Sequence, residues 1–189
     1  MIRKLVQLSF LAVGFAGAMG SGASVAADCS QSQSVLQSFN AKASSAMADQ
    51  PVGYLNLKGV RGSATDASFK DQIPVLAAQQ FMVSGGKGTG AAPDYYLVIP
   101  IDQSSPVLQQ ALSTGTPFIE ATMSYVDGPQ RKVSGRDVLS SVRIILYLQG
   151  TSYSRQYSRV AVIGLSFAKA CWEYGNTKAC YDYSANARF

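Results

Sequence analysis

The sequence predicts a mainly β domain with one short α-helix. Segments rich in aromatic and β-branched residues recur along the chain, with glycine- and proline-containing turns between them. Between two of these segments, within residues 94–126, a short stretch has the apolar spacing of a helix instead. The last two segments flank Gly175-Asn176, a dipeptide suited to a hairpin turn. With 189 residues and 47% apolar content, the chain is long enough for one well-packed core, so we expect a single domain.

Residues 1–27 have the three parts of a secretory signal peptide. Met1–Lys4 is basic, Leu5–Met19 is apolar, and Ala23–Ala27 supplies small residues for cleavage. The apolar run is shorter than the roughly 20 residues of a membrane-spanning helix and contains polar residues and glycines. We therefore expect cleavage, no stable membrane anchor, and a periplasmic or secreted protein.

The charge of the chain does not indicate a nucleic-acid-binding protein. Cleavage lowers the formal net charge from +5 to +3, and the basic residues are scattered singly apart from Arg131 and Lys132. The glycine-rich loop Gly85–Pro93 also lacks the pattern of a phosphate-binding loop, because Lys87 is followed by glycine rather than by serine or threonine. We expect neither nucleic acid nor nucleotide as a partner.

An N-terminal extension, residues 28–50, follows the signal peptide. It is rich in serine, glutamine and alanine, and a thin series of apolar residues recurs in it at helical spacing. Serine is a poor residue for a helix interior, so the sequence leaves two alternatives open: a short helix docked on the domain, or a disordered segment. The domain itself is predicted to span residues 51–189.

The first predicted strands are Val52–Lys58 and Gln72–Ser84. The polar connection between them, Ser63–Asp71, contains Asp66 and Asp71, the closest pair of carboxylates in a loop. With a lysine beside them, these carboxylates are more typical of a solvated turn than of a metal or glycosidase-like site.

The central stretch predicts a strand at Tyr95–Ile101, then the helix, then a strand at Thr116–Val126. Ser105 suits the N-cap of the helix, and Pro106 suits its first position, where the missing amide would be unpaired anyway. Gly115 suits a left-handed residue that ends the helix. The narrow apolar stripe of the helix indicates that one face packs on a sheet.

Another strand is predicted at Val138–Leu148, with four apolar residues on one face: Val142, Ile144, Leu146 and Leu148. A group of tyrosines in and after the strands is a candidate interaction surface, consisting of Tyr95, Tyr96, Tyr153 and Tyr157. Half-buried strand positions are the alternative interpretation of these tyrosines.

The C-terminal hairpin has a predictable register. If Gly175-Asn176 forms a type II′ turn, Cys171 faces Cys180, and two pairs of opposite charge flank them: Glu173 with Lys178, and Lys169 with Asp182. Counting from the turn places the cysteines at a non-hydrogen-bonded site, where α-carbons lie about 4.5 Å apart and a disulfide can form. We therefore predict a Cys171–Cys180 bridge in the oxidising compartment. A bridge from Cys29 to one of them is the alternative.

The chain contains no histidine, so Ser-His-Asp and Cys-His arrangements cannot exist. Ser166 and Lys169 match an S-x-x-K spacing, but residues three apart on a strand point to opposite faces. We therefore predict that the protein is not an enzyme and has no catalytic, cofactor or metal site.

Three blocks of the sequence resemble the haemolysin-coregulated protein (Hcp) family, tube proteins of bacterial type VI secretion systems. The blocks are Tyr54–Ile73, Ile101–Thr122, and Leu165–Tyr174 with Tyr181–Asn186. The resemblance implies a small β-barrel of two packed antiparallel sheets flanked by one short α-helix, without catalysis. It also implies that protomers join as a hexameric ring, and that stacked rings form a tube that holds small effector proteins.

The chain departs from the family pattern in its first block. Ser63 and Ala64 replace the Glu and Ser of G-E-S-T-D, and Phe69 and Gln72 replace the His and Trp of H-K-D-W-I. The signal peptide is a further departure, because the tube proteins assemble in the cytoplasm. We expect an exported structural protein that self-associates into rings and meets type VI secretion components or small effectors. The alternative is a monomeric periplasmic or secreted adaptor that binds a partner through residues 28–50 or the Gly85–Gly90 loop.

Overall fold

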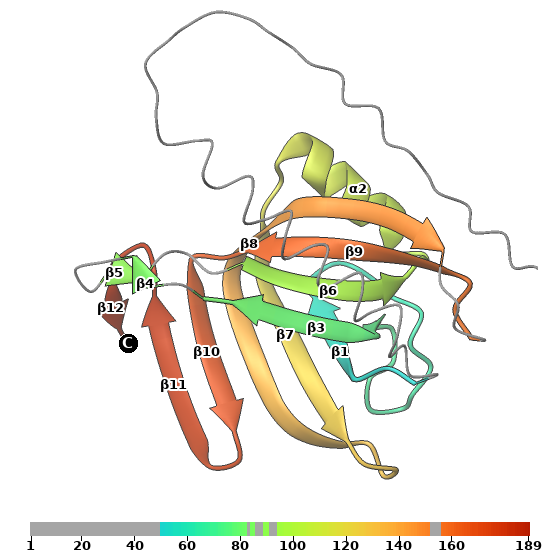
Figure 1. The fold of residues 1–189 in the computed structure, drawn as a ribbon, viewed down its shortest axis with the longest axis horizontal. Helices are drawn as coiled ribbons and strands as arrows, with labels where there is room; N and C mark the ends of the chain where they lie inside the picture. Colours follow the sequence, from blue (N-terminus) through green and yellow to red (C-terminus); the bar gives the residue numbers. More distant parts are fainter. Residues whose placement is uncertain (1–49, 83, 86–88, 91–93, 152–155) are drawn as a thin grey trace, which may run out of the picture. The chain divides into compact units, whose positions relative to one another are not determined.

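A computed structural model describes residues 50–82, 84–85, 89–90, 94–151 and 156–189. The predicted signal peptide, Cys29, Tyr153 and all of the extension except Gln50 lie outside these ranges, so the proposed boundaries at residues 27 and 50 stay predictions. The described chain forms two antiparallel sheets, one helix and a small two-stranded ladder (Figure 1).

The two sheets share one long strand. The first sheet pairs in the order β12 (Ala187–Arg188), β11 (Thr177–Asp182), β10 (Lys169–Tyr174), β8 (Lys132–Thr151), β7 (Phe118–Asp127), β1 (Gly53–Leu57) and β2 (Ile73–Val75). The second pairs in the order β3 (Ala77–Phe81), β6 (Asp94–Pro100), β9 (Arg159–Ser166) and the second half of β8. The separate ladder consists of β4 (Ser84–Gly85) and β5 (Thr89–Gly90).

Strand β8 passes from one sheet into the other. Its first half pairs with β7 and β10, and from Arg143 onward it pairs with β9. Ser141 lies at the crossing with a φ of 56°, and the register with β9 shifts after Ile144. These irregularities change which residues point inward. Val142 and Ile144 are buried as predicted, but the prediction that Leu148 shares their face is wrong, since it is 46% exposed.

The segment predicted as one strand from Gln72 to Ser84 is two strands, β2 and β3. The first pairs with β1 and the second with β6, so the chain changes sheets between them. Leu76 lies at this corner, is buried, and donates its backbone N–H to the Val98 carbonyl at 2.8 Å. The predicted class of two packed antiparallel sheets and one helix is confirmed. The sheets are joined at two corners, however, and the ladder of the described strands does not close as a barrel.

Helix α2 (Ser105–Thr114) packs against β8 and buries Leu108 and Ala111 (Figure 1). Gly115 ends the helix in the left-handed conformation, with a φ of 66°, as the sequence predicts. The N-cap is Ser104, so the prediction of Ser105 is wrong by one residue, and Pro106 occupies the second helical position.

The reason for this shift is the carboxylate of Asp102, which closes the loop before the helix. It accepts the backbone N–H of Ser104 at 2.8 Å and also the Ser104 hydroxyl. The Ser105 hydroxyl in turn accepts the backbone N–H of Asp102 at 3.1 Å. Asp102 therefore supplies the side-chain acceptor that orders the start of the helix.

The core lies between the two sheets, and β6 is its most buried strand. All residues of β6 after Asp94 are buried, because β3 and β9 pair with its edges and side chains cover both faces. Each fully buried aliphatic side chain contributes about 1.5–3 kcal/mol relative to exposure. The core includes Leu55, Ile73, Leu97, Ile99, Leu108, Met123, Leu139, Ile163 and Leu165.

Candidate functional site

The C-terminal hairpin, strands β10 and β11, has the predicted register. Cys171 pairs with Cys180, Glu173 with Lys178, and Lys169 with Asp182. Gly175 occupies the turn with a φ of 59°, which glycine adopts without steric cost. The hairpin therefore presents one face with alternating sulfur and charge, as the sequence indicates.

The cysteines on this face form a disulfide, with their α-carbons 4.0 Å apart. The Lys169 ammonium lies 2.7 Å from the Asp182 carboxylate on one side of the bridge, and Lys178 lies 2.7 Å from Glu173 on the other. The predicted Cys171–Cys180 disulfide is confirmed. Three cross-strand links thus fasten β11 to β10.

Both carboxyl groups of these ion pairs have lowered pKa values. The hydrogen bond to Lys169 is the main cause for Asp182, followed by bonds from the Ser184 hydroxyl and the Ala185 backbone. The hydrogen bond to Lys178 is the main cause for Glu173. A carboxyl group with a lowered pKa in the folded state stabilises the fold above its unfolded pKa, and this contribution disappears as the pH falls.

We expect the hairpin to lose stability as the pH falls below about 4, where unfolded carboxyl groups take up protons. Trp172, the only tryptophan of the chain, lies on β10 and reports on the hairpin by its fluorescence. Urea unfolding followed by this signal should show a midpoint that falls between pH 5 and pH 2. The variant Asp182→Asn should lose part of this pH dependence. An unchanged pH dependence in the variant would contradict a role for the ion pair.

A buried carboxylate lies under the hairpin. Asp137 of β8 is fully buried and accepts three tyrosine hydroxyls: Tyr125 at 2.7 Å, Tyr174 at 2.8 Å and Tyr95 at 3.2 Å. The hydroxyls of Tyr95 and Tyr125 also lie within hydrogen-bonding distance of each other, so their two protons are shared among these three contacts. These residues come from β6, β7, β8 and β10, so the cluster connects both sheets with the hairpin.

The tyrosines of this cluster stay protonated at neutral pH. Burial raises the pKa of Tyr95 and Tyr125 first, and Asp137 raises them further. Burial and the hydrogen bond to Asp137 raise the pKa of Tyr174 to about 12. Neutral hydroxyls that donate to one carboxylate hold strands together and do not supply a base or a nucleophile. We therefore assign the cluster a role in positioning the hairpin.

Two of the predicted interface tyrosines are inside the domain. Tyr95 is 0% exposed and Tyr96 is 7% exposed, because β6 is covered on both faces. The interpretation of these two residues as an interaction surface is wrong, and they are strand positions that are buried more deeply than the half-buried alternative expects. Tyr157 is half-buried and lines a hollow that Tyr54 and Arg131 also line.

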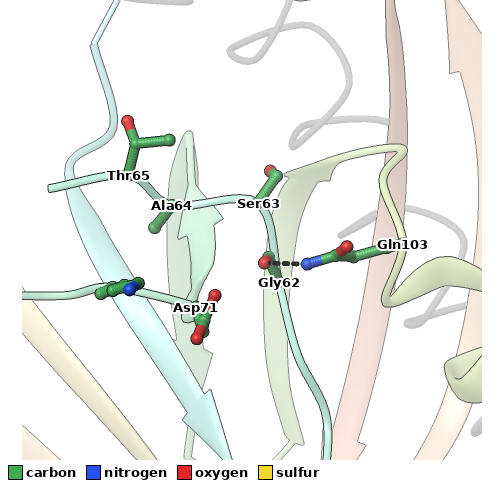
Figure 2. A pocket seen from close by; sticks show the side chains of 7 residues that line it. Gly62, Ser63, Ala64, Thr65, Asp71 and Gln103 are labelled. Carbon is green, nitrogen blue, oxygen red and sulfur yellow. Dashed lines mark hydrogen bonds between the residues drawn. The ribbon is translucent and has the colours of Figure 1, made fainter.

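Two shallow hollows are both lined by Ser63, Ala64 and Thr65 of the loop 62–66. One, of about 410 Å³, is also lined by Lys70, Asp71 and Gln103, and Figure 2 shows Gln103 reaching from the loop before α2 to the backbone of Gly62. Gln103 Nε2 donates to the Gly62 carbonyl at 2.5 Å. Asp71 forms an exposed ion pair with Arg61 at 3.0 Å, which fits the predicted solvated turn.

The second hollow, of about 490 Å³, lies around Tyr54 and Arg131. Arg131 donates to the Tyr54 hydroxyl at 2.9 Å, to the Pro51 carbonyl at 3.1 Å and to Gln50 Oε1 at 3.3 Å. Asp66 lies 3.9 Å from the same guanidinium. The charge of Arg131 thus serves to hold the start of the described chain against the domain.

Comparison with known proteins identifies the family. A family model described as "Type VI secretion system effector, Hcp" matches residues 54–174, which is well over half of the chain. The chain belongs to the Hcp family. This confirms the resemblance seen in the sequence, and no curated protein matches.

Solved Hcp structures share the fold of this chain. Hcp1 from Salmonella typhimurium superposes with a TM-score of 0.65 at 20% identity, covering 72% of this chain and 97% of that one. A type VI secretion system effector from Yersinia pestis has a TM-score of 0.61 at 21% identity, covering 69% and 98%. Hcp2 from Salmonella typhimurium has a TM-score of 0.59 at 23% identity, covering 71% and 98%.

Within this Hcp-family chain, sequence reasoning missed the Asp137 cluster. Its four members are far apart in sequence and belong to four strands, so no local motif connects them. The available signal was the alternation of Gly135, Asp137 and Leu139, which places the aspartate on the inward face of β8. The described residues contain no helix long and apolar enough to cross a bilayer, and they contain no group of three potential metal-binding side chains.

Proposed function

We propose that this protein is an exported structural member of the Hcp family that self-associates into rings related to the type VI secretion tube. The match of the family model to residues 54–174 is the observation that carries the proposal. Two described surface positions support association: Ile119 is 75% exposed and Phe189 is 66% exposed, although both are large and apolar. The partners are further copies of the chain, in a hexameric ring, and small effectors or secretion components that such a ring meets.

The disulfide supports export as part of this proposal. Disulfides form and persist in oxidising compartments, and the cysteines that form this one lie opposite each other in the hairpin. The predicted cleavage of residues 1–27 would deliver the chain to the periplasm, where the bridge can form. The mature protein then assembles in the periplasm or outside the cell.

A monomeric adaptor is the second candidate function. Ser63 and Ala64 replace two residues of the family pattern, and both line the two hollows beside the loop 62–66. A changed surface at this loop favours a new partner over the family's usual assembly. In this case the domain would act as a rigid support for a binding loop.

The mass of the mature protein in solution tests the proposal. The full-length precursor is expressed so that it is exported, and residues 28–189 are purified from the periplasm. Light scattering at about 10 μM protein is expected to give the mass of about six protomers. Native mass spectrometry counts the subunits directly. A single protomer in both measurements would reject the ring and favour the adaptor.

A further inference from the structure

We propose that the end of the N-terminal extension, residues 39–49, docks as a short helix on the outer face of the second sheet of its own chain. The outer face is the side of β3, β6, β9 and the second half of β8 that points away from the core. This inference does not depend on self-association. It chooses between the two alternatives that the sequence leaves open for the extension.

The strand register shows which residues form the outer face. The odd-numbered residues of β6 from 95 to 99 belong to the core between the sheets, so the even-numbered residues point to the other side. Their cross-strand partners share that side. From residue 96 to residue 100 of β6, all of these partners are apolar or glycine except Gln79. The second sheet is therefore apolar on both faces, which requires a cover on each.

The centre of the outer face is buried. Val98 is 1% exposed, Val162 is 6% exposed, and Tyr96 and Val160 are each 7% exposed, although none of them belongs to the core between the sheets. Among the described elements, β2 contacts β6 and α2 contacts β8, and the buried apolar residues of both belong to that core. No described helix or strand packs over the outer face. We therefore infer that its cover comes from a part of the chain outside the described ranges.

The buried area has the width of one helix. All four of these side chains lie on β6 and β9, the two central strands of the sheet, which are neighbours in Figure 1. At the β8 edge, Leu148 lies opposite Val162 on the same face and is 46% exposed. Neighbouring strands are about 4.8 Å apart and a helix is about 10 Å across, so one helix covers two strands and leaves the edges of the sheet open.

The extension ends beside this face. Gln50 and Pro51 line the same hollow as Gln156 and Tyr157, and Arg131 donates hydrogen bonds to the first two. Residues 156 and 157 precede β9, one of the two buried strands. The chain that leads into Gln50 therefore starts at one end of the outer face, and no long connection is needed to reach it.

Residues 39–49 have the length and the apolar spacing that the face requires. Phe39, Ala43 and Met47 recur every four residues, which places them on one side of a helix. At about 1.5 Å per residue, a helix over 39–49 is about 16 Å long. The buried stretch of β6 from Tyr96 to Pro100 spans about 13 Å of strand. The two lengths match, and an aromatic ring and a flexible thioether suit an irregular apolar surface.

This contact makes the extension part of the domain. An exported protein with a bare outer face would present a contiguous apolar patch to water, and such patches bind other chains or membranes. The docked segment prevents this in each copy by itself. The adaptor alternative would then have no free arm in residues 39–49, and a partner would have to displace the helix to bind there.

Substitutions in the extension test the contact in the mature protein, residues 28–189. Amides of residues 39–49 are expected to be protected from hydrogen exchange in the wild type. Phe39→Asp and Met47→Asp place a charge on the docked side, and each should speed this exchange by at least about tenfold. Each should also increase the fluorescence of the apolar dye ANS, which binds exposed apolar surface. Ser45→Asp is the matched control, because residue 45 lies on the opposite side of such a helix, and it should resemble the wild type.

A substitution on the sheet tests the same contact from the other side. Val162→Ala shortens a side chain of the outer face and leaves the inward residues of β9 unchanged, so it should also speed exchange in residues 39–49. Val133→Ala is the matched control, because Val133 is 40% exposed and lies in the other sheet. The fluorescence of Trp172 in the hairpin verifies that each variant remains folded.

Three results would overturn the proposal. The first is unprotected exchange of residues 39–49 in the wild type. The second is exchange in this segment that stays unchanged in both Phe39→Asp and Val162→Ala. The third is protection that is lost on dilution to single protomers, which would assign the cover to a second copy. The mass of the wild-type protein, which tests the proposed function, enters none of the first two results, so the two proposals can fail separately.

Discussion

Replacing Asp137 with alanine is expected to lower the free energy of unfolding by about 3 kcal/mol. The substitution removes the acceptor of three hydroxyls, and Tyr95, which is fully buried, has no bulk water to donate to in its place. Each buried donor without an acceptor costs about 1–3 kcal/mol, which outweighs the gain from no longer burying a charge. Urea unfolding monitored by Trp172 fluorescence measures the loss.

Two further variants make the Asp137 experiment specific. Asp127→Ala removes an exposed carboxylate of β7 and should change the free energy of unfolding by less than about 0.5 kcal/mol. Asp137→Asn keeps the shape and one acceptor oxygen, so its loss should lie between those of the other two. If Asp137→Ala were as mild as Asp127→Ala, the cluster would not hold the hairpin to the sheets.

Replacing both Cys171 and Cys180 with serine is expected to cost about 2.5 kcal/mol, the chain-entropy contribution of a bridge that closes a loop of this length. The bridge spans a sequence separation of only nine residues. We expect β11 and β12 to open first, because among the described strands β11 pairs only with β10 and β12, whereas β10 is paired with β8 along its whole length. Hydrogen exchange should show lost protection in β11 while β6 and β9 keep theirs.

The third cysteine supplies the matched control for this experiment. Cys29→Ser should leave both the stability and the exchange pattern unchanged, because the bridge joins the other two cysteines. Mass spectrometry of a non-reduced digest should find the peptides of Cys171 and Cys180 linked. A peptide containing Cys29 linked to either of them, or a stable β11 in the double-serine variant, would contradict this account.

The sequence predicts the hairpin correctly because its register follows from one short turn. Once Gly175 and Asn176 are taken as the turn, a strict period of two assigns every cross-strand pair, and the charges and cysteines agree with that assignment. The helix is predictable for a similar reason, since Pro106 and Gly115 act locally. Its cap is misplaced by one residue because Asp102, three positions upstream of Ser105, orders the loop through its side chain.

The corners of the fold are not predictable in this way. The segment from Gln72 to Ser84 has a continuous β pattern, and the change of sheets at Leu76 depends on partners from elsewhere in the chain, β1 and β6. In β8, the positive φ of Ser141 and the register shift after Ile144 interrupt the alternation that the sequence analysis assumes. Both features are set by tertiary packing, which a local pattern does not encode.

Which side chains lie on the surface is also set by tertiary packing and not by the local sequence pattern. A strand with aromatic residues on both faces has two interpretations, and only burial of β6 decides that Tyr95 and Tyr96 are internal. Conversely, Ile119 looks like an ordinary core residue in the sequence. Its exposure follows from β1 ending two positions too early to cover it, which is a property of strand lengths in the assembled sheet.

The 20-residue strand β8 has a consequence for how the domain comes apart. Because β8 supplies hydrogen-bond partners to β7 and β10 in one sheet and to β9 in the other, neither sheet can unfold without removing a strand to which the other sheet is paired. The two layers are therefore expected to unfold as one cooperative unit rather than as two independent halves.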